Sequence, residues 1–393
     1  MNLEFAQRTH RMSASAIREI LKVANQEGMI SLAGGIPAPS TFPMEILNSL
    51  FDTALERWKE RIFQYDLSEG FLPLREASVN YLRTFGVESL AQNIFVTSGS
   101  QGLLDAVGKV LIHPGDKVAV ESPCYLGALQ AFRPYQPEFV SVKTDEWGTI
   151  PESLHKVLSQ HRPKFTYLVP TFQNPSGRTL PLQRRKAIAE ILQNHEALLV
   201  EDDPYAALRY GGEPLPSIRS FAPQHVLYAT TLSKTFAPGL RLGLTVPPEG
   251  PMGNELGSWL IKAKQGTDLH TATLGQALAA VYLEEGHLER QLPKIISYYT
   301  PRLQAMLEAL EEHFPQDWTW SHPEGGMFVW AEGPDGTNID AISSQALTQG
   351  VAVVPGHHFH AHPENAPPSF RLNFTNAEPQ QIKKAIAILA QCL

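Results

Sequence analysis

One lysine stands among residues that can hold an anion in the stretch 230–243, T-T-L-S-K-T-F-A-P-G-L-R-L-G. Strand-like apolar runs lie directly before and after it. A lysine that loops out between two buried strands is poorly solvated, and desolvation lowers the pKa of an amine. We therefore expect Lys234 to supply a neutral amine for Schiff-base chemistry. Thr231, Ser233 and Arg241 could hold a phosphate beside it, which together suggests pyridoxal 5′-phosphate. The alternative is an ordinary lysine in a surface loop.

A second candidate anion site is the sequence T-S-G-S-Q-G at 97–102, between a short predicted strand and a helix. The backbone N–H groups of a helix N-terminus favour anions, and the hydroxyls of Ser98 and Ser100 add donors. The alternative is an ordinary helix start, because small residues open many helices.

The sequence Q-N-P-S-G at 173–177 follows another predicted strand. Asn174 precedes Pro175 and is therefore held extended, so that its amide could bond a phenolic oxygen. The alternative is a plain Asn-Pro turn, which is common in loops.

Adjacent acids follow the next strand, in E-D-D-P-Y at 201–205. Acids at the end of a buried strand are costly unless something positive meets one of them. Asp202 could meet a protonated pyridine nitrogen, and Tyr205 could reach the 3′-oxygen of the same ring. A metal site is the competing interpretation, but no histidine pair with useful spacing accompanies the acids.

Arg371 stands in an apolar strand-like run, S-F-R-L-N-F at 369–374. A buried guanidinium needs a partner for its charge, and a substrate carboxylate held by two parallel hydrogen bonds would provide one. An internal salt bridge is the alternative.

The elements that must position these side chains alternate between strands and helices from about residue 94 to residue 246. Their strands are continuously apolar, which indicates a mostly parallel, doubly wound sheet covered on both faces. Ligands of such sheets bind outside the carboxyl ends of the strands. The lysine stretch and the motifs at 97–102, 173–177 and 201–205 fall there. We expect an α/β fold with this sheet in a large domain and a smaller α+β domain at the C-terminus.

We expect three regions in the chain. Residues 1–44 form a helix and an extended arm that packs with the small domain and the active-site cleft. Residues 45–290 form the large domain and residues 291–393 the small one. A long helix, from about residue 289 to residue 313 and interrupted near two prolines, connects the domains.

Composition limits the possible partners and compartment. The 393 residues carry a net charge of −8 without a long basic run, so we expect no nucleic acid as partner. Two cysteines far apart in sequence form no disulfide framework and fit a reducing cytoplasm. The N-terminus has no apolar signal core, and no apolar run is long enough to span a bilayer, so we expect no membrane segment.

Taken together, in this order and at these positions, the motifs resemble those of the fold type I pyridoxal-phosphate enzymes, specifically the class I and II aminotransferases. The resemblance covers about residues 12–389. It implies that Lys234 is the Schiff-base lysine, that Asp202 pairs with the pyridine nitrogen, and that Asn174 and Tyr205 bond the 3′-oxygen. The lysine motif reads T-L-S-K where a serine often stands first, and the threonine there keeps the hydroxyl.

The same resemblance assigns the remaining contacts. Tyr125, in E-S-P-C-Y, matches the aromatic residue that stacks on the cofactor ring. The phosphate is expected to be held by Ser100, Gln101, Thr231 and Arg241. Arg371 is expected to hold the substrate α-carboxylate, with Asn174 and Gly35 also lining the substrate site. Tyr65 matches a tyrosine that reaches the phosphate of the partner subunit, which implies a homodimer.

The N-terminal pattern S-A-I-R-E-I-L-K … I-S-L-A-G-G-I-P-A-P looks most like the 2-aminoadipate, kynurenine and broad-range aminotransferases. The implied reaction is a ping-pong exchange of an amino group between an L-amino acid (2-aminoadipate, aromatic or branched-chain) and a 2-oxo acid such as 2-oxoglutarate. Arg18, at the edge of the predicted N-terminal helix, could read the second carboxylate of acidic substrates; the alternative is a solvated arginine. Other reactions stay open, including decarboxylation, racemisation and β-elimination by a C–S lyase.

Three further interpretations are not favoured. MocR-type regulators carry a similar domain behind a helix-turn-helix domain, for which we expect no room before Met12. The histidines of G-H-H-F-H-A-H, at 356–362, fall in a loop that matches the family's P-G-x-x-F turn, and no carboxylate or cysteine accompanies them, so we expect no metal. Cys124 lacks an identifiable base and is read as a packing residue.

Overall fold

An eight-stranded sheet forms the centre of the computed structural model, which describes residues 3–12 and 28–393. In spatial order its strands are β2 (Phe95–Ser98), β9 (Leu242–Val246), β8 (Val226–Thr231), β7 (Leu199–Asp202), β6 (Thr166–Leu168), β3 (Lys117–Ser122), β4 (Glu138–Asp145) and β5 (Gly148–Thr149). The strands from β8 to β4 are parallel to their neighbours, whereas β9 and β5 are antiparallel to theirs. The predicted mostly parallel sheet is therefore confirmed.

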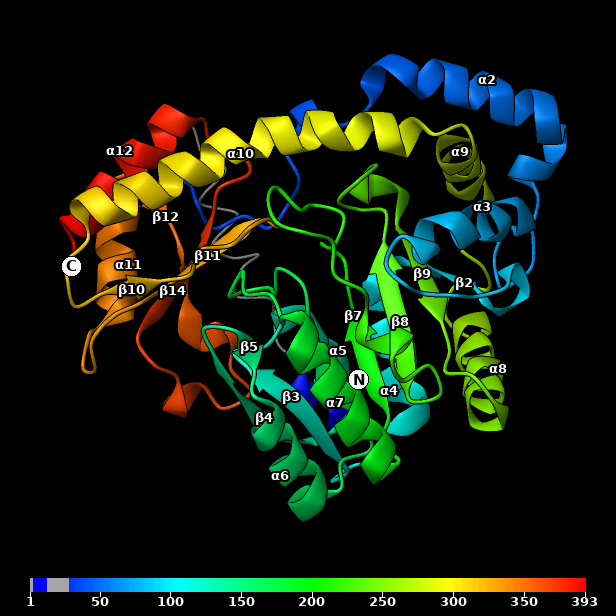
Figure 1. Ribbon diagram of the computed structural model, residues 1–393, viewed down its shortest axis with the longest axis horizontal. Coiled ribbons are helices and arrows are strands. Elements are labelled where there is room, and N and C mark those ends of the chain that lie inside the picture. Colours follow the sequence, from blue (N-terminus) through cyan, green and yellow to red (C-terminus); the bar gives the residue numbers. More distant parts are fainter. Residues whose placement is uncertain (1–2, 13–27) are drawn as a thin grey trace.

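Helices cover both faces of this sheet because its strands alternate apolar side chains between the two faces. Val120, Val200 and Leu227 pack with α4, α5 and α8, whereas Leu199 and Val226 pack with α6 and α7. These helices are α4 (Gly99–Leu111), α5 (Leu126–Phe132), α6 (Pro151–His161), α7 (Leu182–His195) and α8 (Pro251–Gln265). Three more helices, α2 (Leu47–Trp58), α3 (Leu72–Arg83) and α9 (Thr273–Glu284), pack together beside β2 and β9 (Figure 1).

A smaller antiparallel sheet occupies the C-terminal part, in the order β10 (Thr319–Trp320), β11 (Phe328–Glu332), β14 (Ser369–Asn373) and β13 (Val354–Pro355). Beside it, β1 (Ile30–Ser31) and β12 (Val351–Ala352) pair in parallel, so the segment after residue 28 joins the C-terminal part. Two helices, α11 (Ile339–Thr348) and α12 (Pro379–Ala390), complete the region. The α+β character predicted for the C-terminal residues is confirmed.

Helix α10 (His287–His313) runs from beside α9 to α12 and spans the molecule (Figure 1). The prediction that this helix is interrupted near Pro293 and Pro301 is wrong, because α10 is continuous through both residues. Each proline removes one backbone hydrogen bond, but the helix buries an apolar stripe that includes Ile295, Tyr299, Met306 and Leu310. We infer that this burial outweighs the lost bonds.

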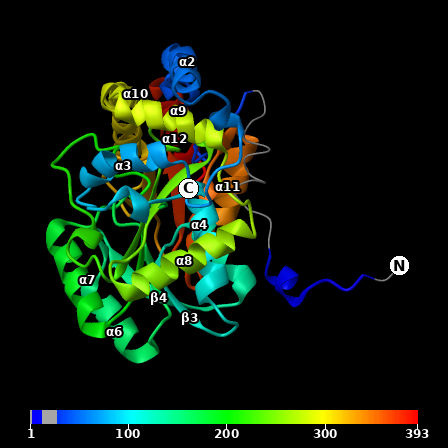
Figure 2. The same ribbon diagram turned by 90° about the vertical axis from the view of Figure 1, so that its right-hand side faces the viewer.

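Figure 2 shows the N-terminal stretch, with the short 3-10 helix η1 (Gln7–Arg11), projecting from the body of the molecule. The N-terminal helix expected around Arg18 lies outside the described residues. The domain limits expected at residues 44 and 290 stay predictions. None of the helices within 3–12 and 28–393 combines the length and apolar character that a bilayer span requires.

Candidate active site

The candidate site lies where the carboxyl ends of the parallel strands meet. Strand β7 ends at Asp202, β8 at Thr231 and β3 at Ser122. Strand β2 ends at Ser98 at the same edge, because Ser98 and Thr231 pair with the first two residues of β9. The alternation of strands and helices therefore brings four of the sequence motifs to one edge of the sheet.

Lys234 follows β8 by three residues, and its side chain is directed at the N-terminal extended segment. Its Nζ donates a hydrogen bond to the backbone oxygen of Gly35 at 3.1 Å, and it lies 5.9 Å from the ring centroid of Tyr205. Burial lowers the pKa of Lys234 to about 8, and the positive charges of Arg371 and Arg241 act in the same direction. The lysine thus has the lowered pKa that its sequence context predicts.

Glu201 and Asp202 point to opposite faces of the sheet because successive side chains of a strand alternate between faces. Glu201 accepts hydrogen bonds from the backbone N–H groups of Ile218 and Arg219, at 2.8 and 2.9 Å. On the opposite face, Asp202 accepts one hydrogen bond from the hydroxyl of Tyr167, at 2.8 Å. The other carboxylate oxygen of Asp202 has no hydrogen-bond partner among the described residues. Burial raises the pKa of Asp202 to about 7, against the effects of Tyr167 and of the nearby Ser100 hydroxyl, which does not reach hydrogen-bond geometry with it.

Arg371 is 1% exposed and lies in β14 of the small sheet. Its Nη1 donates to Asn174 Oδ1 at 3.1 Å and its Nη2 to the backbone oxygen of Ala33 at 2.6 Å. The guanidinium carbon lies 4.5 Å from the ring centroid of Phe328 and 4.9 Å from that of Phe359. Burial lowers the pKa of Arg371 to about 10.

The predicted alternative for Arg371 was an internal salt bridge. In the part of the chain that the structure describes, no carboxylate lies within ion-pair distance of this guanidinium, and its Nε has no hydrogen-bond partner. A buried cation whose only bonds go to neutral oxygens is open to an anionic ligand.

A second cationic corner lies at the N-terminus of α4. The guanidinium of Arg241 is packed on Gly99, where an added Cβ would lie 2.5 Å from Arg241 Nη2. Gly99 also has φ of +70°, so both space and backbone conformation favour glycine there. The hydroxyl of Ser100 has no partner within residues 3–12 and 28–393. Thr231 instead uses its hydroxyl inside the lysine turn, donating to the backbone oxygen of Leu242 at 2.7 Å.

Two of the remaining predicted residues lie against the same edge. Tyr205 is buried, with its ring centroid 6.0 Å from that of Phe328. Tyr125 directly precedes α5, and a Cβ on Gly127 would collide with its ring. Burial, together with the nearby charge of Asp202, raises the pKa of Tyr125 to about 12.

Two predicted side chains make other contacts in the described chain. The side chain of Gln101 is turned toward α5 and donates to the backbone oxygen of Gly127 at 2.8 Å. Tyr65 is 76% exposed and meets the ring of His270 edge-on. Arg18 lies outside the described residues.

Pyridoxal phosphate fits the polar atoms that this arrangement leaves without protein partners. Asp202 Oδ1, Ser100 Oγ and Arg371 Nε are buried and unpaired in the described residues. A pyridinium nitrogen, a phosphate and a substrate carboxylate have the complementary charges and hydrogen-bonding groups. The Gly99 cradle and the lowered pKa of Lys234 fit the same group.

Sequence reasoning missed Tyr167, Phe328 and Phe359. The hydroxyl of Tyr167 reaches Asp202 because β6 pairs with β7, a register that local sequence does not specify. The position of Phe359 in the P-G-x-x-F turn was visible, but its stacking on Arg371 depends on the packing of the small sheet.

The two discounted features have other surroundings. His360 lies 2.9 Å from the hydroxyl of Ser122, and His362 faces the backbone oxygen of Phe139. Among the described residues, no group of three histidine, cysteine, aspartate or glutamate side chains could hold a metal ion. Burial raises the pKa of the Cys124 thiol well above its usual value, which disfavours a thiolate.

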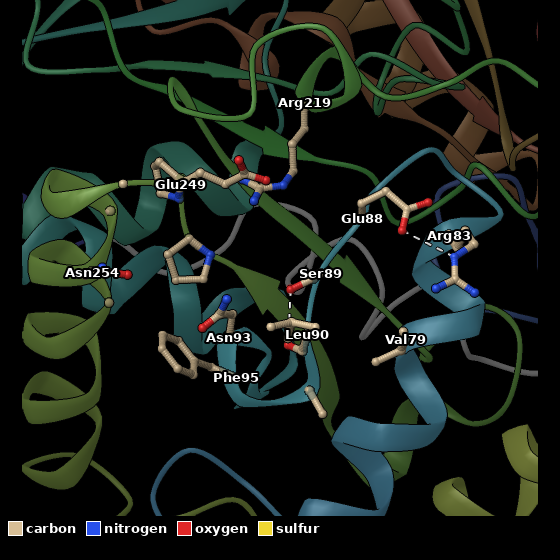
Figure 3. A pocket seen from close by; sticks show the side chains of 16 residues that line it. Val79, Arg83, Glu88, Ser89, Leu90, Asn93, Phe95, Arg219, Glu249 and Asn254 are labelled. Carbon is tan, nitrogen blue, oxygen red and sulfur yellow. Dashed lines mark hydrogen bonds and ion pairs between the residues drawn. The ribbon is translucent and has the colours of Figure 1, made fainter.

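A separate hollow of about 580 Å³ lies at the opposite end of β2, where Phe95 begins the strand. Figure 3 shows its lining, which includes Arg219 and Glu249 and an ion pair between Arg83 and Glu88. It shares no residue with the edge that carries Lys234 and Asp202.

Comparison with known proteins gives consistent matches over almost the whole chain. The family described as aminotransferase class I and II matches residues 43–389. Aromatic-amino-acid aminotransferase 1 of Thermococcus litoralis is 41% identical, with 99% of this chain and 94% of the relative covered. The kynurenine aminotransferase of Pyrococcus horikoshii, in complex with PMP, has a TM-score of 0.93 at 40% identity, with 99% and 96% of the chains covered. LysN, the alpha-aminoadipate aminotransferase of Thermus thermophilus, complexed with N-(5′-phosphopyridoxyl)-L-leucine, has a TM-score of 0.89 at 36% identity, covering 99% and 97%.

Proposed function

We propose the substrates of this chain and the roles of its site residues. The premise is that the chain belongs to the class I and II aminotransferase family and is a pyridoxal-phosphate-dependent transaminase. The proposed reaction exchanges an amino group between an L-amino acid and a 2-oxo acid such as 2-oxoglutarate. The observation that supports these residue roles best is the set of unpaired polar atoms on Asp202, Ser100 and Arg371 beside a lysine of lowered pKa.

The proposed contacts follow the charge of each partner. Asp202 would pair with the pyridine nitrogen, and Asn174 and Tyr205 with the 3′-oxygen. Tyr125 would stack on the ring. The phosphate would be held by Ser100, Arg241 and the backbone at Gln101, because the side chain of Gln101 is bonded to α5. Thr231 would join them by turning its hydroxyl from Leu242 to the phosphate. Arg371 would hold the substrate α-carboxylate, and Gly35 would close the site through its backbone.

When bound, pyridoxal phosphate supplies an electron sink for the carbanion at the substrate Cα and carries the amino group between the half-reactions. Lys234 Nζ would take the proton from Cα and later return one, which requires a neutral amine, and the lowered pKa of Lys234 enlarges the neutral fraction. The Asp202 carboxylate keeps a proton on the pyridine nitrogen by charge. Arg371 fixes the carboxylate and thereby the direction of the Cα–H bond.

Borohydride reduction tests the lysine directly, since it makes the link between cofactor and amine permanent. We expect a pyridoxyl mass on the peptide that contains Lys234. Lys264, which is also partly buried but ion-paired with Asp268 at 2.6 Å, serves as the internal control and should stay unlabelled. A label on any other lysine would overturn the assignment.

The donor class is proposed from the relatives, whose names specify aromatic amino acids, kynurenine and 2-aminoadipate. We propose 2-aminoadipate, aromatic or branched-chain amino acids as donors. A survey of half-reactions, followed by the absorbance of the cofactor, ranks them. A set of fast donors confined to other classes, such as alanine alone, would contradict this choice.

A homodimer with shared active sites is proposed from the position of Tyr65. Its ring is 76% exposed and meets the ring of His270 edge-on, so it could complete a neighbouring site. Mixed dimers of inactive Tyr65→Ala and Lys234→Ala chains should regain activity, because one of their two sites is intact at both positions. Verified hybrids without recovery of activity would count against shared active sites.

Two free cysteines agree with a proposed cytoplasmic location.

A further inference from the structure

We propose that Glu121 is a positioning residue that holds the loop carrying Tyr125 and the turn carrying Asn174 at a fixed separation, with Gln173 as the bridge. This inference rests on the proposed function, since it concerns the seat of the cofactor ring. Glu121 is 2% exposed and lies in β3, four residues before Tyr125. It takes no part in the reaction described above.

The carboxylate of Glu121 accepts hydrogen bonds from three separate segments. Oε1 accepts from the hydroxyl of Thr149 at 2.8 Å, and Oε2 from the backbone N–H of Val169 at 3.0 Å. Oε2 also accepts from Nε2 of Gln173 at 3.3 Å. Burial raises the pKa of Glu121 to about 7, whereas these donors act in the opposite direction.

Both polar atoms of the Gln173 side-chain amide, Nε2 and Oε1, form hydrogen bonds. Its Nε2 donates to the backbone oxygen of Pro123 at 2.8 Å as well as to Glu121. Its Oε1 accepts from the backbone N–H and the hydroxyl of Ser176, at 2.9 and 2.6 Å. A carbonyl can only accept and a backbone N–H can only donate, so these partners fix the orientation of the amide.

The two loops joined in this way carry the proposed ring contacts. Pro123 stands two residues before Tyr125, and Gln173 and Ser176 flank Asn174 in the same turn. Asn174 in turn accepts the hydrogen bond of Arg371. A shift of the bridge would therefore move the stacking ring, the 3′-oxygen ligand and the carboxylate ligand together.

Substitution of Glu121 tests the bridge, with the loaded enzyme as the material. Glu121→Gln keeps an acceptor for Val169 and Gln173, because the Thr149 hydroxyl can turn to accept from the new amide. Glu121→Leu removes the acceptor at similar volume. The matched control is Leu192→Ala, which opens a cavity among α7 residues in the core on the other side of the strands from α4 and lowers stability without touching either loop.

The readouts are the melting temperature, kcat/KM for one amino acid, and the circular dichroism of the bound cofactor. We expect Glu121→Leu to lower kcat/KM by about 10- to 100-fold, the scale of a misplaced reacting group, and to weaken the circular dichroism of the bound cofactor. Glu121→Gln should keep kcat/KM and the circular dichroism of the cofactor close to the values of the parent enzyme. Leu192→Ala should lower only the melting temperature.

A Glu121→Leu enzyme that behaves like Leu192→Ala would overturn the proposal, as would Glu121→Gln losing as much as Glu121→Leu. If Glu121→Leu does not fold, Gln173→Met breaks the same bridge while Glu121 keeps Thr149 and Val169, and the same losses are expected. Asn174→Ala is measured alongside. If Asn174→Ala changes the signal and the bridge variants do not, this inference alone fails; if Asn174→Ala also changes nothing, the proposed role of Asn174 fails.

Discussion

The two arginines of the candidate site have opposite surroundings. Arg371 is 1% exposed, lies between two aromatic rings and is held by the side chain of Asn174 and the backbone of Ala33. Arg241 is exposed at the end of a short turn, and within the described residues its guanidinium donates hydrogen bonds only to the backbone oxygens of Pro238 and Ser98, at 3.3 and 3.5 Å. The guanidinium of Arg371 is therefore desolvated, whereas that of Arg241 is hydrated.

This difference predicts different energetics for the two ends of the site. A desolvated cation without a counter-ion costs free energy in the folded protein, and an arriving anion offsets that cost. Binding a carboxylate at Arg371 should therefore be strong and insensitive to salt. An exposed cation interacts weakly and is screened by salt, so Arg241 should contribute little without its neighbours at the α4 N-terminus.

Removal of the buried charge is the most severe way to test the comparison. Arg371→Gln should lower kcat/KM by about 2–5 kcal/mol for every amino acid, because a buried, hydrogen-bonded charge pair is truncated. Cofactor binding should change little. Arg185→Gln is the control: Arg185 is equally buried but bonded to the backbone of Leu180 and Pro170, and its loss should lower the melting temperature and spare KM. Equal KM effects in both variants would contradict a specific carboxylate role.

A third arginine would sharpen the comparison if it is mobile. Arg18 is proposed from sequence alone to read the second carboxylate of acidic substrates. Arg18→Gln should cost about 1.5–3 kcal/mol in kcat/KM for 2-oxoglutarate or 2-aminoadipate, the scale of a hydrogen bond to a charged group. Leucine and phenylalanine should change little. An equal loss for all substrates would mean that the segment is structural, and no loss would mean that Arg18 faces water.

The exposed charge should give a smaller and salt-dependent effect. Arg241→Gln should weaken cofactor binding by about 1 kcal/mol at low salt, and the difference from the parent should shrink as salt is raised. Titration of cofactor into stripped enzyme at two ionic strengths measures both. A loss that is large and independent of salt would show that Arg241 is desolvated in the loaded enzyme and would break the comparison.

The smallest effect concerns the pH at which Lys234 becomes reactive. Its pKa is lowered to about 8 first by burial, then by Arg371 and then by Arg241. The neutral fraction grows as pH rises, so the rate of cofactor attachment to stripped enzyme should rise with pH and level off above about pH 8. Arg371→Gln removes a positive charge and should move this midpoint upward, and Arg241→Gln should move it less. A midpoint unmoved by either change would assign the lowered pKa to burial alone.

The strands, their order of appearance and the motifs at their ends were predictable because they depend on local patterns. Lys234 and Asp202 each follow an apolar run, and the sheet rule places such residues at one edge. The partner of Gln101 was not predictable, since it depends on where α5 packs. The continuity of α10 through Pro293 was missed because long-range packing outweighed a local preference. Tyr167 was missed because its hydrogen bond needs the pairing of β6 with β7.

The alternation of the acids in β7 limits how this sequence can drift. Glu201 and Asp202 occupy opposite faces because each strand residue turns by half a revolution. An insertion of one residue between Leu199 and Glu201 would exchange the two faces and leave the type of every existing residue unchanged. Apolar substitutions at Leu199 or Val200 keep both acids on their faces, whereas a change in the length of the strand does not. Related chains should therefore differ in the composition of this strand but keep its length.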